Sequence, residues 1–443
     1  MTENFASPTP PASLTAGLDA LLRARAITPA DREAAALFVL DALANALAGR
    51  QSEPGKIITD WAGAEPRDSA GRAFVFGALT HILEVDDLHR ASVVHPGCVV
   101  VPAALAVANR IGAGGHDFLD AVLWGFEVAC RIGMAVGPGH YRIWHNTATC
   151  GPFGAAAAAG RLLGLDSAGM VAALGNAGSQ SAGLWQFIET GAMTKHLHAG
   201  HAAGAGVNAA DLAARGFSGP PHILEGDKGF FRATCPDAVP AAVLAEPDAP
   251  WALTRTSIKP WPSCRHTHPA IDAALELAPQ LQGRAVREIA VATYPAALDV
   301  CNRPDPQTPY EAKFSLHHCI AAALADGKVT FDSFEAEARA RLAPWRAKVA
   351  PAIANRYAAA YPKAWGSALH LTLADGTILH AARDHALGDP EAPLDRAALT
   401  EKAKMLLAHA RIGPALAHRL AIGLLAFADN GPLPDLAPFV NLA

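Results

Sequence analysis

Residues 199–215, with the sequence AGHAAGAGVNAADLAAR, decide the fold class of this 443-residue chain. Alanine and glycine fill most of these positions, and the few polar side chains leave most faces of a helix apolar. Small side chains let helices approach closely, and a helix without a broad polar side is buried among other helices. The stretch therefore predicts a helix in the interior of a large all-α domain.

The same pattern recurs over the first 250 residues. Stretches rich in Ala and Leu, with apolar residues at helical spacing, predict further helices at residues 34–47, 72–85, 99–111, 118–135, 154–163 and 170–182. Gly49 stands where a C-cap glycine would end the first of them. These helices together predict one large helical unit.

The pattern changes after Pro250. Residues 287–294 (REIAVATY) alternate as a strand does. Residues 368–373 and 378–382 flank Asp375-Gly376, which predicts a hairpin with a type I′ turn. Further helices are predicted within this region at residues 269–277, 314–325 and 334–349. This part is therefore expected to be α+β.

The last segment, residues 395–443, is again rich in Ala and Leu and is expected to return to the helical domain. Its predicted helices cover residues 395–410 and 414–428. We therefore expect a mainly α protein. Residues 1–256 and 395–443 are expected to form a large all-helical domain, and residues 257–394 a smaller α+β lid domain.

Composition excludes several classes of protein. Hydrophobic residues make up 51% and charged residues 17%, which is too apolar for a disordered chain. The formal net charge of −5, without a basic block, argues against a nucleic acid or an anionic membrane as partner. No apolar stretch is long enough to span a bilayer, and the N-terminus lacks the features of a signal peptide, so we expect a short polar tail there.

The cysteines point to a reducing compartment. Their number is odd, they are widely spaced and none forms a CxxC pair. This favours reduced thiols in a cytoplasmic protein over a disulfide framework or a zinc site. The seven positions are Cys98, Cys130, Cys150, Cys235, Cys264, Cys301 and Cys319.

The first block of chemically active residues is HILEVDDLH at 81–89, followed by His95. Its carboxylates, Glu84 and Asp86 among them, and its histidines must pair, be hydrated or bind a ligand. One interpretation is a solvated helix end where they satisfy each other. Metal binding is the rival interpretation, but the block lacks an HxxxH or HxH core, so we expect no metal.

Two further blocks are typical of anion sites. His145 lies between glycines, beside aromatic residues and before a helix of small residues, whose N-terminus favours an anion. Lys195 opens another small-residue helix beside three histidines, where its charge opposes the helix dipole and suits a bound carboxylate. The plainer alternatives are a packing histidine before a capped helix and a surface lysine lying over apolar residues.

A fourth block, KPWPSCRHTH at 259–268, lies at the predicted domain junction, where ligand clefts are common. Cys264 beside Arg265 has the setting of a nucleophile, yet its neighbours also suit binding of an acid. The chain has no GxGxxG after a strand, no GxxxxGK[ST] and no GxSxG, which argues against a nucleotide site and a serine hydrolase.

The order of these blocks resembles the MmgE/PrpD family. The resemblance covers nearly the whole chain from about residue 30. It is carried by AFVFGALTHILEVDDLHRASVVHPGCVVVPAALAVA, GFEVACRIG, HYRIWHNTATCGPFGAAAAAGRLLGLD, MTKHLHAGHAAGAGVNAADLAARGFSGP, KPWPSCRHTH, NRPDPQTPYEAKFSLHH and ALGDPEAPL. It implies a helical domain with an α+β lid, a homodimer, and no obligatory metal or organic cofactor.

The resemblance also implies a cleft between the domains. Carried over by motif, the catalytic residues fall on His95, His145, Lys195 and Glu84, and Asp86 or Glu84 is expected to orient His95. Substrate-binding residues fall on Lys259 and are expected at Cys264, Arg265, His268 and Arg303, the last in a specificity loop.

Three positions depart from the pattern of the relatives. Glu84 replaces a common Asp, Leu88 replaces a small hydroxyl residue, and Cys264 replaces the His of decarboxylase relatives. The departures at Leu88 and Cys264 argue against decarboxylation of cis-aconitate.

The family includes 2-methylcitrate dehydratase, cis-aconitate decarboxylase and iminodisuccinate epimerase, which share proton movement at a carbon next to a carboxylate. We expect a hydro-lyase acting on a small hydroxy-di- or tricarboxylate. Epimerisation of an imino- or amino-dicarboxylate is the alternative reaction, and decarboxylation is the third. The MTK form of the lysine block and the spacing between Asp87 and His95 look more like the epimerase branch. A helical scaffold without activity is the non-enzymatic alternative.

Overall fold

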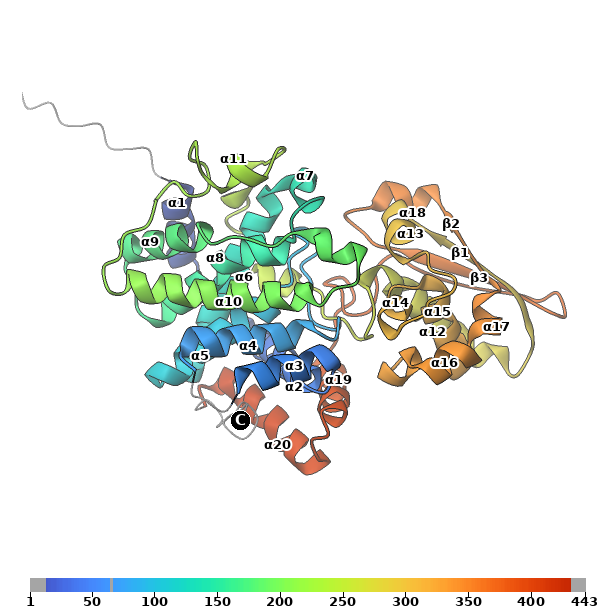
Figure 1. The fold of residues 1–443 in the computed structure, drawn as a ribbon. Coiled ribbons are helices and arrows are strands. Elements are labelled where there is room, and N and C mark those ends of the chain that lie inside the picture. The colour runs from blue at the N-terminus through green and yellow to red at the C-terminus, as the bar shows by residue number, and fades with distance from the viewer. Residues whose placement is uncertain (1–12, 64–66, 432–443) are drawn as a thin grey trace, which may run out of the picture.

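The computed structural model describes residues 13–63 and 67–431 and has two bodies (Figure 1). The larger, called here the helical body, consists of α1–α11 with the C-terminal α19 and α20. The smaller, called the α+β body, consists of α12–α18 and a four-stranded sheet. This arrangement confirms the mainly α prediction with a smaller α+β part.

The helical body is built around α10 (Thr194–Ala213), which contacts α8 (Asn146–Leu162) and α4 (Ser69–His81) along much of its length. On the other side of α8 lies α6 (Gly115–Ala135). The helix predicted from residues 199–215 is confirmed and mostly buried. The remaining helices of this body are α1 (Leu14–Ala24), α2 (Pro29–Gly49), α3 (Glu53–Ala62), α5 (Gly97–Ile111), α7 (Gly137–Tyr141), α9 (Ser167–Gly178) and α11 (Phe230–Thr234).

Missing side chains make this packing possible. A Cβ added to Gly206 would lie 2.3 Å from the Cβ of Ala155, so only glycine lets α10 approach α8 at that point. Gly49 has the same function toward α4, where an added Cβ would lie 2.2 Å from the carbonyl oxygen of Leu79. The prediction of a C-cap glycine is therefore wrong, because Gly49 is still helical and Arg50 is the C-cap residue.

The helix predicted for residues 72–85 ends earlier, at His81. Glu84 adopts a left-handed backbone conformation with φ +62°, which a helix cannot continue through. Residues 82–88 form a loop that leaves the end of α4, and we call it the Glu84 loop. This loop carries the carboxylates of the first charged block.

The α+β body has the strand order β2-β1-β3-β4. β1 (Val286–Thr293) pairs in parallel with β2 (Val349–Ile353) and antiparallel with β3 (Ser367–Leu373), which pairs with β4 (Ile378–Arg383). Helices α12 and α15 pack on one face of the sheet. The helices of this body are α12 (His268–Leu281), α13 (Pro295–Cys301), α14 (Pro309–Lys313), α15 (Leu316–Asp326), α16 (Ala336–Arg341), α17 (Ala343–Arg346) and α18 (Asn355–Ala360).

Two local predictions in this body are wrong. The single helix expected at residues 334–349 is two short helices followed by β2, and Pro344 lies in the first turn of the second helix. The hairpin turn is not type I′, because that turn needs positive φ at both central residues and only Gly376 has it. The hairpin itself is confirmed, with Leu373 and Thr377 joined by a hydrogen bond.

The C-terminal helices return to the helical body, as predicted. Both α19 (Arg396–His409) and α20 (Pro414–Leu425) contact α2. The chain crosses between the bodies where Ile258 donates a hydrogen bond to the carbonyl of Gly388. We propose that these adjacent crossings mark the domain boundaries, near residues 256 and 394. Within the described residues, no helix is both long and apolar enough to cross a membrane.

Replacement of Gly206 by Ala is expected to destabilise the protein by about 1–3 kcal/mol, because the new methyl group overlaps Ala155. Urea denaturation would measure this loss. The matched control is Asn208→Ala on the exposed side of α10, which is expected to change the free energy of unfolding by less than about 0.5 kcal/mol. Equal stabilities of the two variants would contradict the close packing of α10 on α8.

Candidate active site

A cavity of ≈ 390 Å³ lies between the two bodies, and most of the predicted site residues line it. The helical body contributes Glu84, Leu88, Val93, His95, Tyr141, Arg142, His145, Trp185, Phe187, Ile188 and Lys195. The chain beyond residue 257 contributes Lys259, Cys264, Arg265, His266, Val300, Tyr310, Phe314 and Trp365. All four charged blocks of the sequence therefore meet in one space.

Glu84 and Lys195 form a buried ion pair at this cavity. Lys195 Nζ donates a hydrogen bond to Glu84 Oε1, and Lys259 Nζ lies 3.9 Å from Glu84 Oε2. Burial alone raises the pKa of Glu84, but Lys195 and Lys259 outweigh it and hold that pKa well below its ordinary value. The carboxylate beside Lys195 is thus that of Glu84, which belongs to the same chain. Lys195 is not a surface lysine, because it is only 8% exposed.

Three lysines from distant parts of the chain hold the Glu84 loop by its backbone. Lys313, Lys259 and Lys402 donate hydrogen bonds to the consecutive carbonyls of residues 83, 84 and 85, over 3.2, 3.0 and 2.7 Å. Lys402 lies on α19 and also pairs with Asp41 of α2 at 2.6 Å. By returning to the helical body, the C-terminal helices therefore place Lys402 where it stabilises the Glu84 loop.

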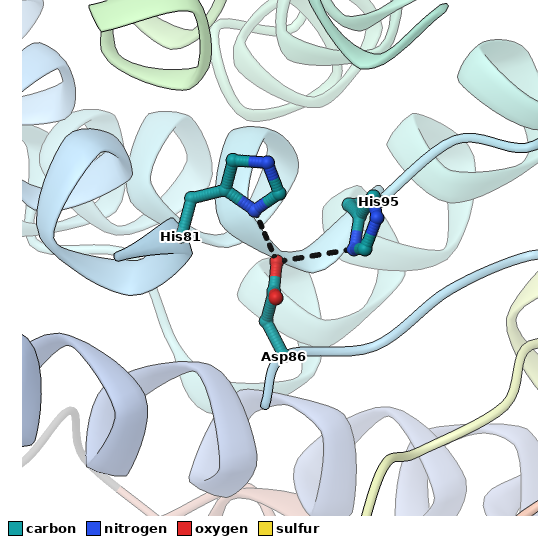
Figure 2. A group of neighbouring side chains, drawn as sticks. All are labelled: His81, Asp86 and His95. Carbon is teal, nitrogen blue, oxygen red and sulfur yellow. Dashed lines mark hydrogen bonds and ion pairs between the residues drawn. The ribbon is translucent and has the colours of Figure 1, made fainter. Parts of the chain in front are cut away.

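Asp86 is shared by two histidines (Figure 2). Its Oδ2 lies 2.6 Å from Nδ1 of His81 and 3.3 Å from Nδ1 of His95. Burial raises the pKa of Asp86, but the two imidazoles outweigh this and hold that pKa well below its ordinary value. Because all three side chains are buried, a solvated helix end is excluded for this block.

The same three side chains have the chemistry of a metal site, since imidazole nitrogen and carboxylate oxygen are common ligands. Two ligands of one tetrahedral zinc ion at about 2.0–2.1 Å are about 3.3 Å apart. The 2.6 Å between His81 and Asp86 is instead the length of a strong hydrogen bond. The geometry therefore fits a hydrogen-bonded carboxylate–histidine pair.

The adjacent Asp87 has a different task. Both of its carboxylate oxygens accept a hydrogen bond from Gly97 N, the first residue of α5, at 3.0 and 3.1 Å. A Cβ at Gly97 would lie within 2.9 Å of this carboxylate, so glycine is required there. Asp87 thus fixes the start of α5 and, two residues before it, the position of His95.

His145 is the N-cap residue of α8, as expected for a residue that opens this helix. Its Nδ1 lies 3.3 Å from Nδ1 of His198, and its ring contacts those of Trp185 and His81, with centroids 4.7 and 5.7 Å away. Among the described residues Nε2 makes no hydrogen bond, which leaves this nitrogen for proton transfer.

The two cavity histidines are neutral at pH 7. Burial, reinforced by His81 and Lys195, lowers the pKa of His145 well below its ordinary value. Burial also lowers the pKa of His95 to about 4, although Asp86 acts in the opposite direction. An exposed histidine titrates near neutrality, and burial moves both rings away from that range. The sequence does not reveal this degree of burial.

The fourth block is only partly in the cavity. Lys259, Cys264 and Arg265 line it, and Arg265 also pairs with Asp389 at 2.5 Å. His268 does not line the cavity, because it starts α12 and is buried against Arg265 and the carbonyl of Ser263. Arg303 is exposed just beyond α13 and does not line the cavity either.

The structure adds residues that the sequence did not single out. Arg142 lies three residues before His145, and Tyr310 is the second residue of the short helix α14. His266 stacks on Trp365 with centroids 4.4 Å apart and contacts the Tyr294 hydroxyl at 2.7 Å. Their only signal in the sequence was proximity to charged blocks, which does not show which side chains face the cavity.

Known proteins resemble this chain over more than half of its length. It is 30% identical to cis-aconitate decarboxylase of Homo sapiens over 281 residues, covering 59% of this chain and 56% of the human protein. It is 30% identical to the Mus musculus cis-aconitate decarboxylase over 293 residues, covering 60% and 56%. For the Aspergillus terreus cis-aconitate decarboxylase, the identity is 27% over 286 residues, covering 59% and 58%. The match spans less than two thirds of each relative.

Two family models account for most of the chain. The MmgE/PrpD N-terminal domain matches residues 20–242, and the MmgE/PrpD C-terminal domain matches residues 261–422. The first match alone covers half of the chain and includes the Glu84 loop, His145 and Lys195. With a helical body, an α+β body and a charged cavity between them, the chain belongs to the MmgE/PrpD family.

Proposed function

We propose that this chain is an enzyme that moves a proton at a carbon next to a carboxylate of a small hydroxy-di- or tricarboxylate, with loss of water as the overall reaction. One observation carries the proposal. Two neutral imidazoles, His95 and His145, line the same cavity as Lys195 and Lys259. Elimination of water needs a base for the carbon-bound proton and an acid for the leaving hydroxyl, and this cavity offers a group for each.

In the proposed reaction, Lys195 and Lys259 bind the carboxylate next to the reacting carbon. Charge moves onto that carboxylate as the C–H bond breaks, and a fixed ammonium group stabilises it. His145, neutral and with Nε2 unengaged, takes the carbon-bound proton. His95 donates a proton to the leaving hydroxyl, which departs as water while the C=C bond forms. Asp86, 3.3 Å from His95 Nδ1, orients that ring and stabilises its charged form.

Decarboxylation is the second candidate, because the relatives described above are named cis-aconitate decarboxylases. It would use the same cations to hold the charge left by departing CO2 and one histidine to protonate the carbon. It requires no base, so it leaves one of the two cavity histidines without a task. Leu88 and Cys264, where the resemblance leads one to expect a hydroxyl residue and a histidine, both line the cavity.

The reaction is tested by a thermal-shift screen of C4 to C7 polycarboxylates, including hydroxy acids, cis-aconitate and amino-dicarboxylates, followed by NMR of each stabilising compound in D2O. A ligand at about 100 times its dissociation constant adds about 2.7 kcal/mol of stability. New alkene signals without loss of carbon support dehydration, and loss of CO2 supports decarboxylation. Deuterium at the substrate carbon without an alkene identifies an epimerase. Absence of turnover with every compound would contradict an enzymatic function.

Replacement of Lys195 by Met is expected to lower kcat by at least about 10²–10³, because the variant lacks the ammonium that stabilises the developing charge. Steady-state kinetics with the substrate found in the screen would measure it. The matched control is Lys228→Met, an exposed lysine away from the cavity, which should retain full activity. If Lys195→Met unfolds because Glu84 loses its partner, the neutral pair Lys195→Met/Glu84→Gln replaces it. Wild-type turnover by either folded variant would rule out the role of Lys195.

Substrate binding at pH 7 is expected to take up close to one proton per site. The pKa of His95 is about 4, so the ring is neutral in the free protein, and it must be protonated in the complex to act as the acid. An anionic substrate beside it raises its pKa. Titration calorimetry in two buffers of different ionisation enthalpy would measure the uptake. The His95→Asn variant should lose it, and a wild-type binding enthalpy independent of the buffer would contradict the role of His95.

We also propose that the protein is a homodimer, in line with the family resemblance. An apolar groove of ≈ 320 Å³ lies on the helical body, and its side chains include Ile57, Trp61, Met193 and Leu197, which are 43–59% exposed. Exposed apolar patches of this kind mark protein interfaces. Light scattering should give twice the chain mass of 45.9 kDa, and Trp61→Glu should give the monomer. A monomeric wild-type protein would overturn this proposal.

A further inference from the structure

We propose that Arg142 binds the carboxylate of the substrate that lies furthest from the reacting carbon, and so makes the enzyme specific for substrates with at least two carboxylates. This inference rests on the proposed function, since it assumes a polycarboxylate in the cavity. It assigns to Arg142 a substrate-binding role outside the lysine and histidine set used for the proposed reaction.

The other cations that line the cavity already have carboxylate partners. Lys195 pairs with Glu84, and Arg265 pairs with Asp389 at 2.5 Å. Lys259 lies 4.0 Å from Asp86 Oδ1 and 3.9 Å from Glu84 Oε2. The lining thus has four cations, with Arg142 as the fourth, and three carboxylates in contact with them.

Arg142 is the cation left over. Among the residues that the structure describes, its side chain makes no ion pair and no hydrogen bond, although it lines the cavity. It is exposed, at the C-cap of α7, and therefore faces the entrance as well as the cavity. A guanidinium group in this position can bind an incoming carboxylate through two parallel hydrogen bonds.

The backbone that carries Arg142 is fixed relative to His145. The carbonyl of Ile143 accepts a hydrogen bond from Trp185 N, and His145 N donates one to the carbonyl of Gly183, both over 3.0 Å. These bonds tie the segment to the chain around Trp185. The distance between the proposed base and the guanidinium stem is therefore set by the fold, so it can select for the spacing between the reacting carbon and the outer carboxylate.

The surroundings favour a charged contact at the entrance. Trp185 and the buried Phe187 line the same cavity, so a carboxylate bound there would exchange part of its water for aromatic surface. An ion pair is stronger in such surroundings than in water. A second carboxylate bound there would balance the charge that Arg142 leaves uncompensated.

The test combines a change in the protein with a change in the substrate. Binding of malate and citrate is compared with binding of their mono-amides, in which one carboxylate is neutral, for the wild type, Arg142→Met and Arg142→Lys. For the acids, Arg142→Met should weaken binding, and raise KM, by about 10–100-fold, the size of a hydrogen-bonded charge pair. For the mono-amide that lacks the outer carboxylate, wild type and Arg142→Met should agree within about threefold.

Two further results complete the test. Arg142→Lys should restore part of the loss for the acids, because it keeps the charge without the two parallel hydrogen bonds. The control Arg232→Met, at an exposed arginine of α11 outside the cavity, should bind all compounds as the wild type does.

The outcomes separate the two proposals. An equal effect of Arg142→Met on acids and mono-amides, or no effect on either, would overturn the role of Arg142 and leave the proposed reaction intact. If the acids bind and the Arg142 effect is seen but no compound is turned over, the proposed reaction fails and the carboxylate subsite stands. Lack of binding by every acid would overturn both.

Discussion

Three ammonium groups on three consecutive backbone carbonyls are the interaction on which this site depends. The Glu84 loop has a left-handed residue and cannot be stabilised as a helix, so its carbonyls need other donors. Lys313, Lys259 and Lys402 supply them from the α+β body, the junction and the last helices. The loop that carries Glu84 and Asp86 is therefore held only when all three parts of the chain are in place.

This constraint explains the charge state of the cavity. Buried lysines around the loop keep Glu84 ionised, and Glu84 in turn raises the pKa of Lys195 above its ordinary value against the effect of burial. The histidines nearby are buried among these cations and stay neutral. A cavity with fixed cations and neutral imidazoles is suited to receive an anion and then to move a proton.

The small side chains of the helical body serve the same end. Gly206 lets α10 approach α8, and α10 positions Lys195 while α8 begins after His145. Close packing of two alanine-rich helices thus fixes the two residues on one wall of the cavity. Gly97 fixes the position of a third residue, His95. Because Gly97 has no side chain, the Asp87 carboxylate can accept a hydrogen bond from its N–H at the start of α5, just after His95.

The sequence by itself determined the buried helices, the hairpin at residues 367–383 and the four charged blocks, because these depend on local spacing and side-chain size. It did not show that residues 334–349 hold two short helices and a strand, since β2 exists only by pairing with β1, some 60 residues away. Only the tertiary structure decided that Lys195 pairs with Glu84, that His268 and Arg303 stay outside the cavity, and that Arg142 enters it. The physical reason is that charge pairing and pKa depend on burial and on contacts between residues distant in the chain, and neither is encoded in local pattern.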